Sequence, residues 1–440
     1  MLTAQNLYSE NKLGNGNNMK NTARQIKRDY IWNMTAGLIN ASEAVIMSMI
    51  VTRITGLEDA GILSIAFSIG ILMVPIGKFG LRPYQATDIG KQFSFSVYVK
   101  ARMVTVLLMI ISICIYLINA FINRGYNWNK ISIIFSICMI YVIESVEDVI
   151  WGYYQNRNRL DMGAKLFCFR WIGILLVFPV LLYISHSLVF TLIFCCLVAA
   201  ILFLFLLRVS FPHIASKEDR NVSLVIRKSD LKDIKKLLVT AVPLMATSFL
   251  SVYVNNAPKY AIDACMTDEI QACYGFVAMP VFVIKLLNNF IYQPMLVPMA
   301  VEWDQKQTDK FTARVVRQIM IIAGISVICI IGACLLGIPV LSMLYNTDLS
   351  DYKRELIILL FGSGFLTFSG YMGVVLTIMR CQKSLIWPYC LVSIISAIVL
   401  KPVVSKYGTI GASGCYLFII ALLCFLYSAV FVVKLKGNRK

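Results

Sequence analysis

Twelve apolar segments, each long enough to cross a bilayer, fill most of this chain, and they constrain its fold more than any other feature. An α-helix needs about 20 predominantly apolar residues to span roughly 30 Å of hydrocarbon. The segments predict twelve membrane-spanning helices, six on each side of a basic polar stretch. Their expected positions are 31–54, 60–79, 101–122, 131–150, 164–185, 187–209, 236–257, 270–298, 315–341, 354–379, 384–400 and 409–433.

Composition supports an all-α integral membrane protein rather than a soluble one. The chain is 59% hydrophobic and only 15% charged, whereas soluble domains carry about 25% charged residues. The first 18 residues are polar and Asn-rich, so we expect no cleavable signal peptide, and either Met1 or Met19 can be the start. The predicted parts are a disordered basic cytoplasmic tail at 1–30, a six-helix bundle at 31–209, a basic cytoplasmic linker at 210–235, a second six-helix bundle at 236–433 and a basic cytoplasmic tail at 434–440.

The net charge of +18 follows the predicted topology and does not indicate nucleic-acid binding. When loops are assigned to alternate sides from a cytoplasmic N-terminus, 32 of the 41 Lys and Arg fall inside and 8 outside, and Lys285 lies within a span. This bias obeys the positive-inside rule. We therefore expect a multi-pass protein of the cytoplasmic membrane with both termini inside, and anionic membrane lipids as partners of its basic loops.

The two predicted bundles resemble each other. The acidic turn GLEDAG and a span with Pro75 follow the first span. After the seventh span come an acidic turn with Asp263, Asp268 and Glu269, then QACYG and a span with Pro280. Basic runs precede the third and ninth spans, at FSVYVKAR and FTARVVRQ. Six-helix repeats share one orientation, so their pseudo-symmetry axis lies along the membrane normal, and a central cavity between them is the natural substrate site.

The stretch TRITGLEDAGILSIAFSIGILMVPIGKFGLRPYQATDI, from Thr52 to Ile89, resembles the start of bacterial polysaccharide and O-antigen flippases. WGYYQNRNRLDMGAK, APKYAIDA and QACYG are similar to the same family, and the likeness runs from about Asp29 to the last span. These flippases form the polysaccharide-transporter branch of the multidrug/oligosaccharidyl-lipid/polysaccharide exporter superfamily.

The resemblance implies a MATE-like fold of two bundles that work by alternating access. It also implies export of an undecaprenyl-pyrophosphate-linked oligosaccharide for cell-surface polysaccharide biosynthesis, with other polysaccharide-assembly membrane proteins as further partners. An ion-coupled drug or cation antiporter of the same fold is the main alternative. A membrane-embedded polymerase or acyltransferase fits less well, because every predicted outside loop is short.

Two charges fall near the middle of predicted spans, Glu43 in the first and Lys285 in the eighth. A charge at mid-bilayer costs about 2.5–3.5 kcal/mol on insertion scales, so each needs a partner or a watery cavity. We expect both to face the central cavity, where Lys285 would bind an anionic pyrophosphate as a point charge. The alternatives are a structural Glu43–Lys285 ion pair or a Lys285 that reaches the membrane interface.

Glu144, Glu147 and Asp148 end the fourth predicted span, and their spacing places them on one helical face near the cytoplasmic side. Three clustered carboxylates suit ion coupling, because their mutual repulsion favours proton or cation uptake. Arg157 and Arg159 follow within two turns, so a salt-bridged cytoplasmic gate, with Arg82 as a further member, is an equal alternative. A solvated helix end is the third.

Three further cations are candidate substrate-binding residues. Arg53 and Lys259 lie at matching outer ends of the first and seventh spans, where they either attract sugar phosphates or anchor the helices at the interface. Arg82 lies in FGLRPYQATD, where we expect Pro83 to stop the span. It would engage pyrophosphate or lock the turn to a carboxylate.

The sequence predicts neither an enzyme nor a cofactor site. It contains no Walker loop, no GxSxG and no HExxH. The 13 cysteines include no CxxC pair and there are only two histidines, so no metal site is expected.

Overall fold

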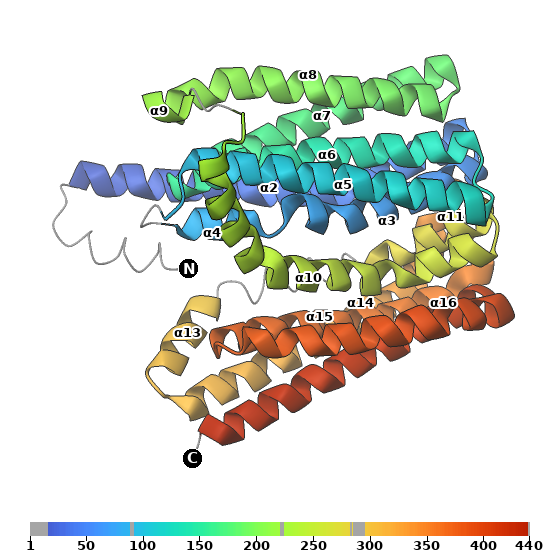
Figure 1. The fold of residues 1–440 in the computed structure, drawn as a ribbon. Helices are drawn as coiled ribbons and strands as arrows, with labels where there is room; N and C mark the ends of the chain where they lie inside the picture. Colours follow the sequence, from blue (N-terminus) through green and yellow to red (C-terminus); the bar gives the residue numbers. More distant parts are fainter. Residues whose placement is uncertain (1–15, 89–91, 221–223, 282–283, 285–294, 439–440) are drawn as a thin grey trace. The chain divides into compact units, whose positions relative to one another are not determined.

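The computed structural model describes residues 16–88, 92–220, 224–281, 284 and 295–438, which form helices joined by short connections (Figure 1). No β-strand occurs in these ranges. The first half contains α2 (Gly16–Ile54), α3 (Leu57–Lys78), α4 (Leu81–Thr87), α5 (Phe95–Arg124), α6 (Trp128–Asn156), α7 (Leu160–Ser185), α8 (Leu188–Ile214) and α9 (Lys217–Arg220). The second contains α10 (Lys228–Cys265), α11 (Asp268–Ala278), α13 (Leu296–Asp304), α14 (Thr308–Tyr345), α15 (Lys353–Ile378) and α16 (Ile386–Asn438), with 3₁₀ turns at Ser350–Tyr352 and Gln382–Leu385.

Among the described helices, nine are long and apolar enough to cross a membrane. One of them, α16, runs through the last two predicted spans. Its backbone leaves helical geometry at Gly408 (φ 60°, ψ −145°), which separates the two spans. The fourth predicted span coincides with α6, and the eighth begins as α11 and continues into residues outside the described ranges. The prediction of an all-helical, multi-pass membrane fold is confirmed.

Internal contacts divide the chain into two compact units. Unit 1 comprises Met1–Met47, Met73–Ile122 and Phe135–Met245, and unit 2 comprises Ser48–Leu72, Asn123–Ile134 and Ala246–Lys440. Unit 2 therefore includes two segments from the first half of the chain. The change of unit after Met245 lies inside α10 and not in the predicted linker at 210–235.

In unit 1, α5 and α6 run side by side (Figure 1), and α5 shows why apolar residues occur all round such a helix. Its buried face repeats every three or four residues. The members are Tyr98, Ala101, Thr105, Met109, Ile113 and Leu117. The opposite face is exposed but also apolar, with Leu107, Ile111, Ile115 and Ile118. An exposed aliphatic face is stable in contact with lipid, so the helix fits a bilayer on one side and a protein core on the other.

In unit 2, α15 packs along both α14 and α16, and α11 packs against α14 and α15. Phe276 of α11 stacks on Tyr345 at the end of α14, with ring centroids 3.8 Å apart and planes 7° from parallel. Both rings are buried. Aromatic stacking of this kind adds about 0.5–1.5 kcal/mol to the burial of the rings.

Helix α2 begins at Gly16, inside the stretch 1–30 that was predicted as a disordered tail. Two polar side chains from this helical part of the stretch bond to a distant helix. Gln25 Nε2 donates to Asp161 Oδ1 of α7 at 2.7 Å, and Asp29 Oδ1 accepts from the Asp161 backbone N–H at 2.8 Å. These bonds extend the helix beyond its apolar part.

The end of α3 also differs from the prediction that Pro83 stops the span. The helix ends at Lys78, and both Phe79 (φ 48°) and Gly80 (φ 64°) adopt the left-handed conformation. Pro83 lies in the first turn of α4, where its missing N–H would have no helical acceptor in any case. The left-handed pair therefore makes the corner.

Candidate functional site

The three acids of α6 are buried side by side in unit 1. Glu144, Glu147 and Asp148 are 7%, 1% and 4% exposed, so the solvated helix end is wrong. Their spacing of three and four residues puts them on one face of α6, as expected. Burial in a membrane protein makes each carboxylate dependent on a cation or a hydrogen-bond donor.

Lys78 and Arg170 neutralise two of these acids. Lys78 Nζ, at the end of α3, lies 2.7 Å from Glu144 Oε1. Arg170 of α7 donates from Nε to Glu147 Oε2 at 2.8 Å, and its Nη2 lies 3.7 Å from Glu144 Oε2. The Arg170 side chain is completely buried, and within the described residues its Nη1 and Nη2 have no hydrogen-bond acceptor. A planar guanidinium with donors to spare suits a bidentate anion.

Asp148 is the third acid and has two arginine partners. Arg102 Nη2 of α5 lies 2.7 Å from Asp148 Oδ2, and Arg82 Nη1 of α4 lies 3.7 Å from Oδ1. Arg102 Nη1 also donates to the Gly77 carbonyl at 2.5 Å. Gly77 allows a close helix approach, because a Cβ there would meet Met109 Sδ at 2.4 Å and Ser145 Oγ at 2.6 Å. The close helix approach thus brings the α3 carbonyl within reach of Arg102.

We call this set the α6 charge network: Lys78, Arg82, Arg102, Glu144, Glu147, Asp148 and Arg170. It contains four cations and three carboxylates. All of its members come from the first half of the chain and from unit 1. A surplus cation held among membrane helices is unfavourable unless another negative group neutralises it.

Glu43 lies in the same unit, within electrostatic range of Lys78, Glu144 and Arg170. It is 2% exposed, and the Tyr141 hydroxyl donates to its Oε1 at 3.0 Å. Its Oε2 is buried without a hydrogen-bond partner in the described part of the chain. If ionised, Glu43 supplies the fourth negative charge. The expected partner, Lys285, lies outside the described residues.

Arg157 and Arg159 do not pair with the α6 acids as expected, and the cytoplasmic gate stays a prediction. Arg157 Nη2 pairs with Asp219 Oδ2 at 2.9 Å, and Arg159 Nε pairs with Asp161 Oδ1 at 3.1 Å. Both arginines lie beyond the end of α6. Because they lie outside the helix, helical spacing does not place them on the same face as the α6 acids. Arg82 is the predicted gate residue that does contact an α6 acid.

Neither Lys78 nor Tyr141 was among the predicted site residues, and nor were two arginines near the ends of predicted spans, Arg102 and Arg170. Both arginines are buried, at 1% and 0% exposure. A signal was present, because each arginine occupies a position on the apolar face of its helix. Arg102 lies between Tyr98 and Thr105 on the buried face of α5. A charge in phase with a buried stripe indicates a partner on a neighbouring helix.

The remaining predicted substrate residues lie in unit 2. Arg53 Nη2 donates to the Met343 and Leu344 carbonyls at 3.2 and 3.1 Å. It therefore caps the C-terminus of α14, where carbonyls lack helical donors and the helix dipole favours a cation. Lys259 of α10 is half-buried and makes no ion pair or hydrogen bond that we find among the described residues.

The chain matches the family model described as "Polysaccharide biosynthesis protein" over residues 26–303. It is also 21% identical over 395 residues to the capsular polysaccharide biosynthesis protein CapF of Staphylococcus aureus, covering 88% of this chain and 94% of that protein.

Solved structures show the same fold at low identity. An inward-facing MATE-family multidrug resistance transporter of the MOP superfamily superposes with a TM-score of 0.68 at 13% identity, covering 91% of this chain and 95% of that one. The Vibrio cholerae MATE transporter VcmN in its bent form gives 0.58 at 12% identity, with 95% and 98% coverage. A MOP-superfamily transporter from Pyrococcus furiosus, described as having a binding pocket of reverse polarity, gives 0.56 at 14% identity, with 95% and 97% coverage.

These similarities confirm both the MATE-like fold and the relationship to polysaccharide-assembly proteins predicted from the sequence. The family model covers more than half of the 440 residues. The chain belongs to the polysaccharide biosynthesis protein family and has the fold of MATE transporters.

Proposed function

We propose that this protein moves a pyrophosphate-linked, lipid-anchored oligosaccharide from the inner to the outer leaflet of the cytoplasmic membrane for assembly of a surface polysaccharide. The observation that carries the proposal is the family match over residues 26–303 in a chain with a transporter fold. The two predicted six-helix bundles alternate their access to the two sides, both termini are cytoplasmic, and the protein does not itself carry out a chemical reaction.

The charge balance supports an anionic substrate. With Glu43 uncharged, four cations of the α6 charge network face three carboxylates, and Arg170 keeps two buried donors free of acceptors in the described residues. Lys259 of α10 adds a half-buried cation for which we find no acidic partner in those residues. A pyrophosphate is a strong acceptor for guanidinium and ammonium groups. In this proposal it binds to Arg170 and Lys78 of unit 1. Lys259 and Lys285 stay candidate substrate residues, each tested by itself.

The test is the leaflet location of the lipid-linked glycan in cells that carry the host glycan locus but lack this gene. We expect the glycan to accumulate on the cytoplasmic face and the wild-type gene to restore surface glycan. Arg170→Lys keeps the charge but loses the fork geometry, so we expect export to fall by about tenfold, which corresponds to one lost bidentate contact of about 1.4 kcal/mol. Lys285→Ala and Lys259→Ala test the other two cations.

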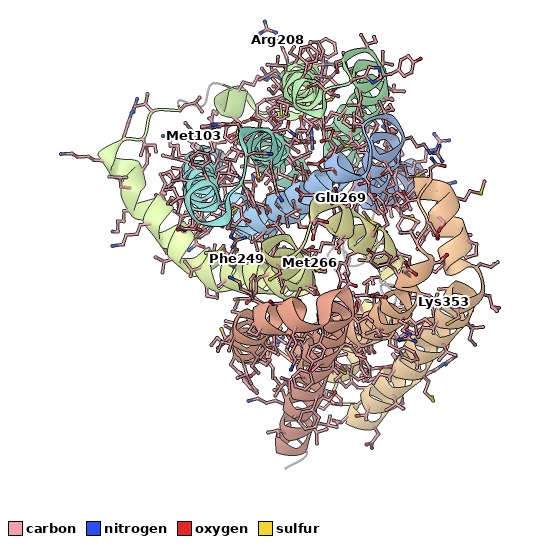
Figure 2. The ribbon with its side chains drawn as sticks, turned by 90° about the vertical axis from the view of Figure 1, so that its right-hand side faces the viewer. Met103, Arg208, Phe249, Met266, Glu269 and Lys353 are labelled. Carbon is pink, nitrogen blue, oxygen red and sulfur yellow. The ribbon has the colours of Figure 1, made fainter. Side chains whose placement is uncertain are left out.

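Arg208 provides the matched control. It is an exposed arginine on α8, and Figure 2 shows it at the edge of the molecule. Arg208→Lys should leave export unchanged at equal protein amount. Normal surface glycan in the deletion strain would refute the proposal, and equal export by Arg170→Lys and Arg208→Lys would remove Arg170 from the substrate path.

One observation favours the drug or cation antiporter as a second candidate. Glu43 has a buried carboxylate oxygen with no hydrogen-bond partner in the described residues, and such an oxygen can take up a proton or a cation. Sensitivity of the deletion strain to cationic dyes, with normal surface glycan, would support this alternative. Glu43→Gln should then abolish dye efflux, whereas a flippase that uses no proton should retain export.

A further inference from the structure

A second buried charge cluster lies in unit 2, at the end of the helices that the charge pattern places outside. Lys130, at the start of α6, bridges two acids, with Nζ 2.8 Å from Asp263 Oδ1 and 2.6 Å from Asp268 Oδ1. The side chains of Lys130 and Asp263 are 10% and 0% exposed. A charge pair this buried is strongly destabilised when one partner is removed.

Asp263 receives two more groups from the connection between α5 and α6. Arg124 Nη1 lies 3.7 Å from Asp263 Oδ2, and the Tyr126 hydroxyl donates to the same oxygen. Three side chains from the first half of the chain thus converge on a single carboxylate near the end of α10. More than 130 residues separate these side chains from Asp263 in the sequence, so bringing them together closes a long loop. No local conformational preference holds them together.

A polar cavity of about 400 Å³ adjoins this cluster. Its walls include Glu58 at the start of α3, Asn127 before α6, and Met266 and Glu269 at the turn into α11. Figure 2 views this end of the helices and labels Met266 and Glu269. Hydrogen bonding from the Thr267 side chain lowers the pKa of Glu269 below its usual value, so this wall carries a negative charge. Water in such a cavity would solvate the charges if the contacts parted.

The helices next to the cluster touch through small residues. A Cβ on Gly61 of α3 would lie 1.7 Å from the Asp268 carbonyl oxygen, and one on Gly275 of α11 would lie 2.4 Å from Ser64 Oγ. The Tyr260 hydroxyl of α10 donates to the Ser68 carbonyl at 2.8 Å. Residues of α3 therefore pack directly on α10 and α11, without intervening side chains at positions 61 and 275.

We propose that these contacts form an outer latch, in which Arg124, Tyr126 and Lys130 hold Asp263 and Asp268 and keep the outer end of the transporter closed. The proposal rests on the proposed function as an alternating-access transporter. Opening to the outside separates segments 48–72 and 123–134 from α10 and α11, which breaks the ion pairs and exposes them to water. Solvation of the parted charges offsets much of the lost attraction, so the latch can close and reopen.

The experiment measures opening directly. A Ser64→Cys reporter places a thiol on α3 beside Gly275, at a position that is 3% exposed. Intact cells are treated with a membrane-impermeant maleimide, and labelling is compared with the same protein without the reporter, which carries the 13 native cysteines. We expect slow labelling of the reporter. The labelling rate should rise about tenfold or more when Lys130→Gln or Asp263→Asn removes one member of the buried pair.

A charge exchange separates the latch from general loosening. Lys130→Asp alone should open the outer end, and Lys130→Asp combined with Asp263→Lys should bring labelling back toward the parent. The matched control is Arg314→Gln, which breaks the Arg314–Glu302 ion pair elsewhere in unit 2 and should leave labelling unchanged. Protein amount is measured in every variant.

Unchanged labelling in Lys130→Gln and Asp263→Asn at normal protein amount would overturn the proposal, as would an equal rise in Arg314→Gln. The readout does not use glycan. If the flippase assignment is wrong and the latch is right, labelling responds as expected while glycan export is normal in the deletion strain.

Discussion

The α6 charge network and the outer latch are both buried clusters of acids and bases among membrane helices, but they differ in where their members come from. The network in unit 1 uses only the first half of the chain, and its acids lie within one turn of α6. The latch in unit 2 joins Lys130 from the first half to Asp263 from the second. Within the described residues, the network has donors without acceptors at Arg170, whereas every charged member of the latch has a charged partner.

This difference indicates different roles under one physical rule. A buried ion pair is stable only while both partners stay in place. In the proposed transport cycle, pairs within one half persist while the halves move, and a surplus donor among them binds a substrate. In the same proposal, pairs between the halves break and re-form in each cycle, so their charges need partners in the closed state and water in the open state.

The largest expected loss of stability follows from a substitution in the α6 charge network. Arg170→Met leaves Glu147 and Glu144 buried without this guanidinium, and we expect a loss of about 3–5 kcal/mol in the free energy of unfolding. Adding Glu147→Gln removes an unpaired charge and should recover part of that loss. Unfolding of the purified protein in detergent measures both, with Arg208→Met as the exposed control. A loss equal to that of the control would show that Arg170 is not a structural partner of the α6 acids.

Substitution of a glycine beside the outer latch tests the close helix contact there. Gly61→Ala introduces a Cβ 1.7 Å from the Asp268 carbonyl oxygen, and overpacking of this kind costs about 1–3 kcal/mol. No atom of the described residues lies within 4 Å of the Cβ position of Gly324 in α14, so Gly324→Ala should stabilise the helix by about 0.5–1 kcal/mol. The same unfolding experiment gives both values, and effects of the same sign would contradict the close contact of α3 with α11.

One tyrosine hydroxyl bonds to an acid in each region, and removing each hydroxyl compares how much the two regions depend on it. Tyr141→Phe removes a donor from Glu43, whose other oxygen has no partner in the described residues, and should cost about 1–3 kcal/mol. Tyr126→Phe should cost about 0.5–1.5 kcal/mol, because Asp263 keeps Lys130 and Arg124. Unfolding measurements on the two single variants suffice. A larger loss from Tyr126→Phe would reverse the ranking of the two sites.

The smallest effect is expected at an exposed ion pair. Arg380 Nη2 lies 3.9 Å from Asp304 Oδ1, and the two side chains are 88% and 82% exposed. Solvent screening reduces such pairs to about 0–1 kcal/mol, so Arg380→Ala should leave the unfolding free energy nearly unchanged. A loss as large as that of Arg170→Met would mean that burial does not separate structural from incidental charge pairs in this protein.

The sequence predicted the helical membrane fold well and the charged sites only in part. Hydropathy over about 20 residues reports the free energy of moving a helix into lipid, and it depends on no other segment. The shared face of Glu144, Glu147 and Asp148 followed from helical spacing alone. Their partners could not be inferred in this way, because Lys78, Arg102 and Arg170 come from three other helices.

By itself, then, the sequence determined the spans, the family and the face on which the α6 acids lie, since each depends on local composition or local periodicity. Only the tertiary structure decided that Arg53 caps α14, that Arg157 and Arg159 bind other acids, and that Lys130 joins Asp263. A long cationic side chain takes whichever acceptor the neighbouring helices bring within about 3–4 Å, and helix packing sets that distance.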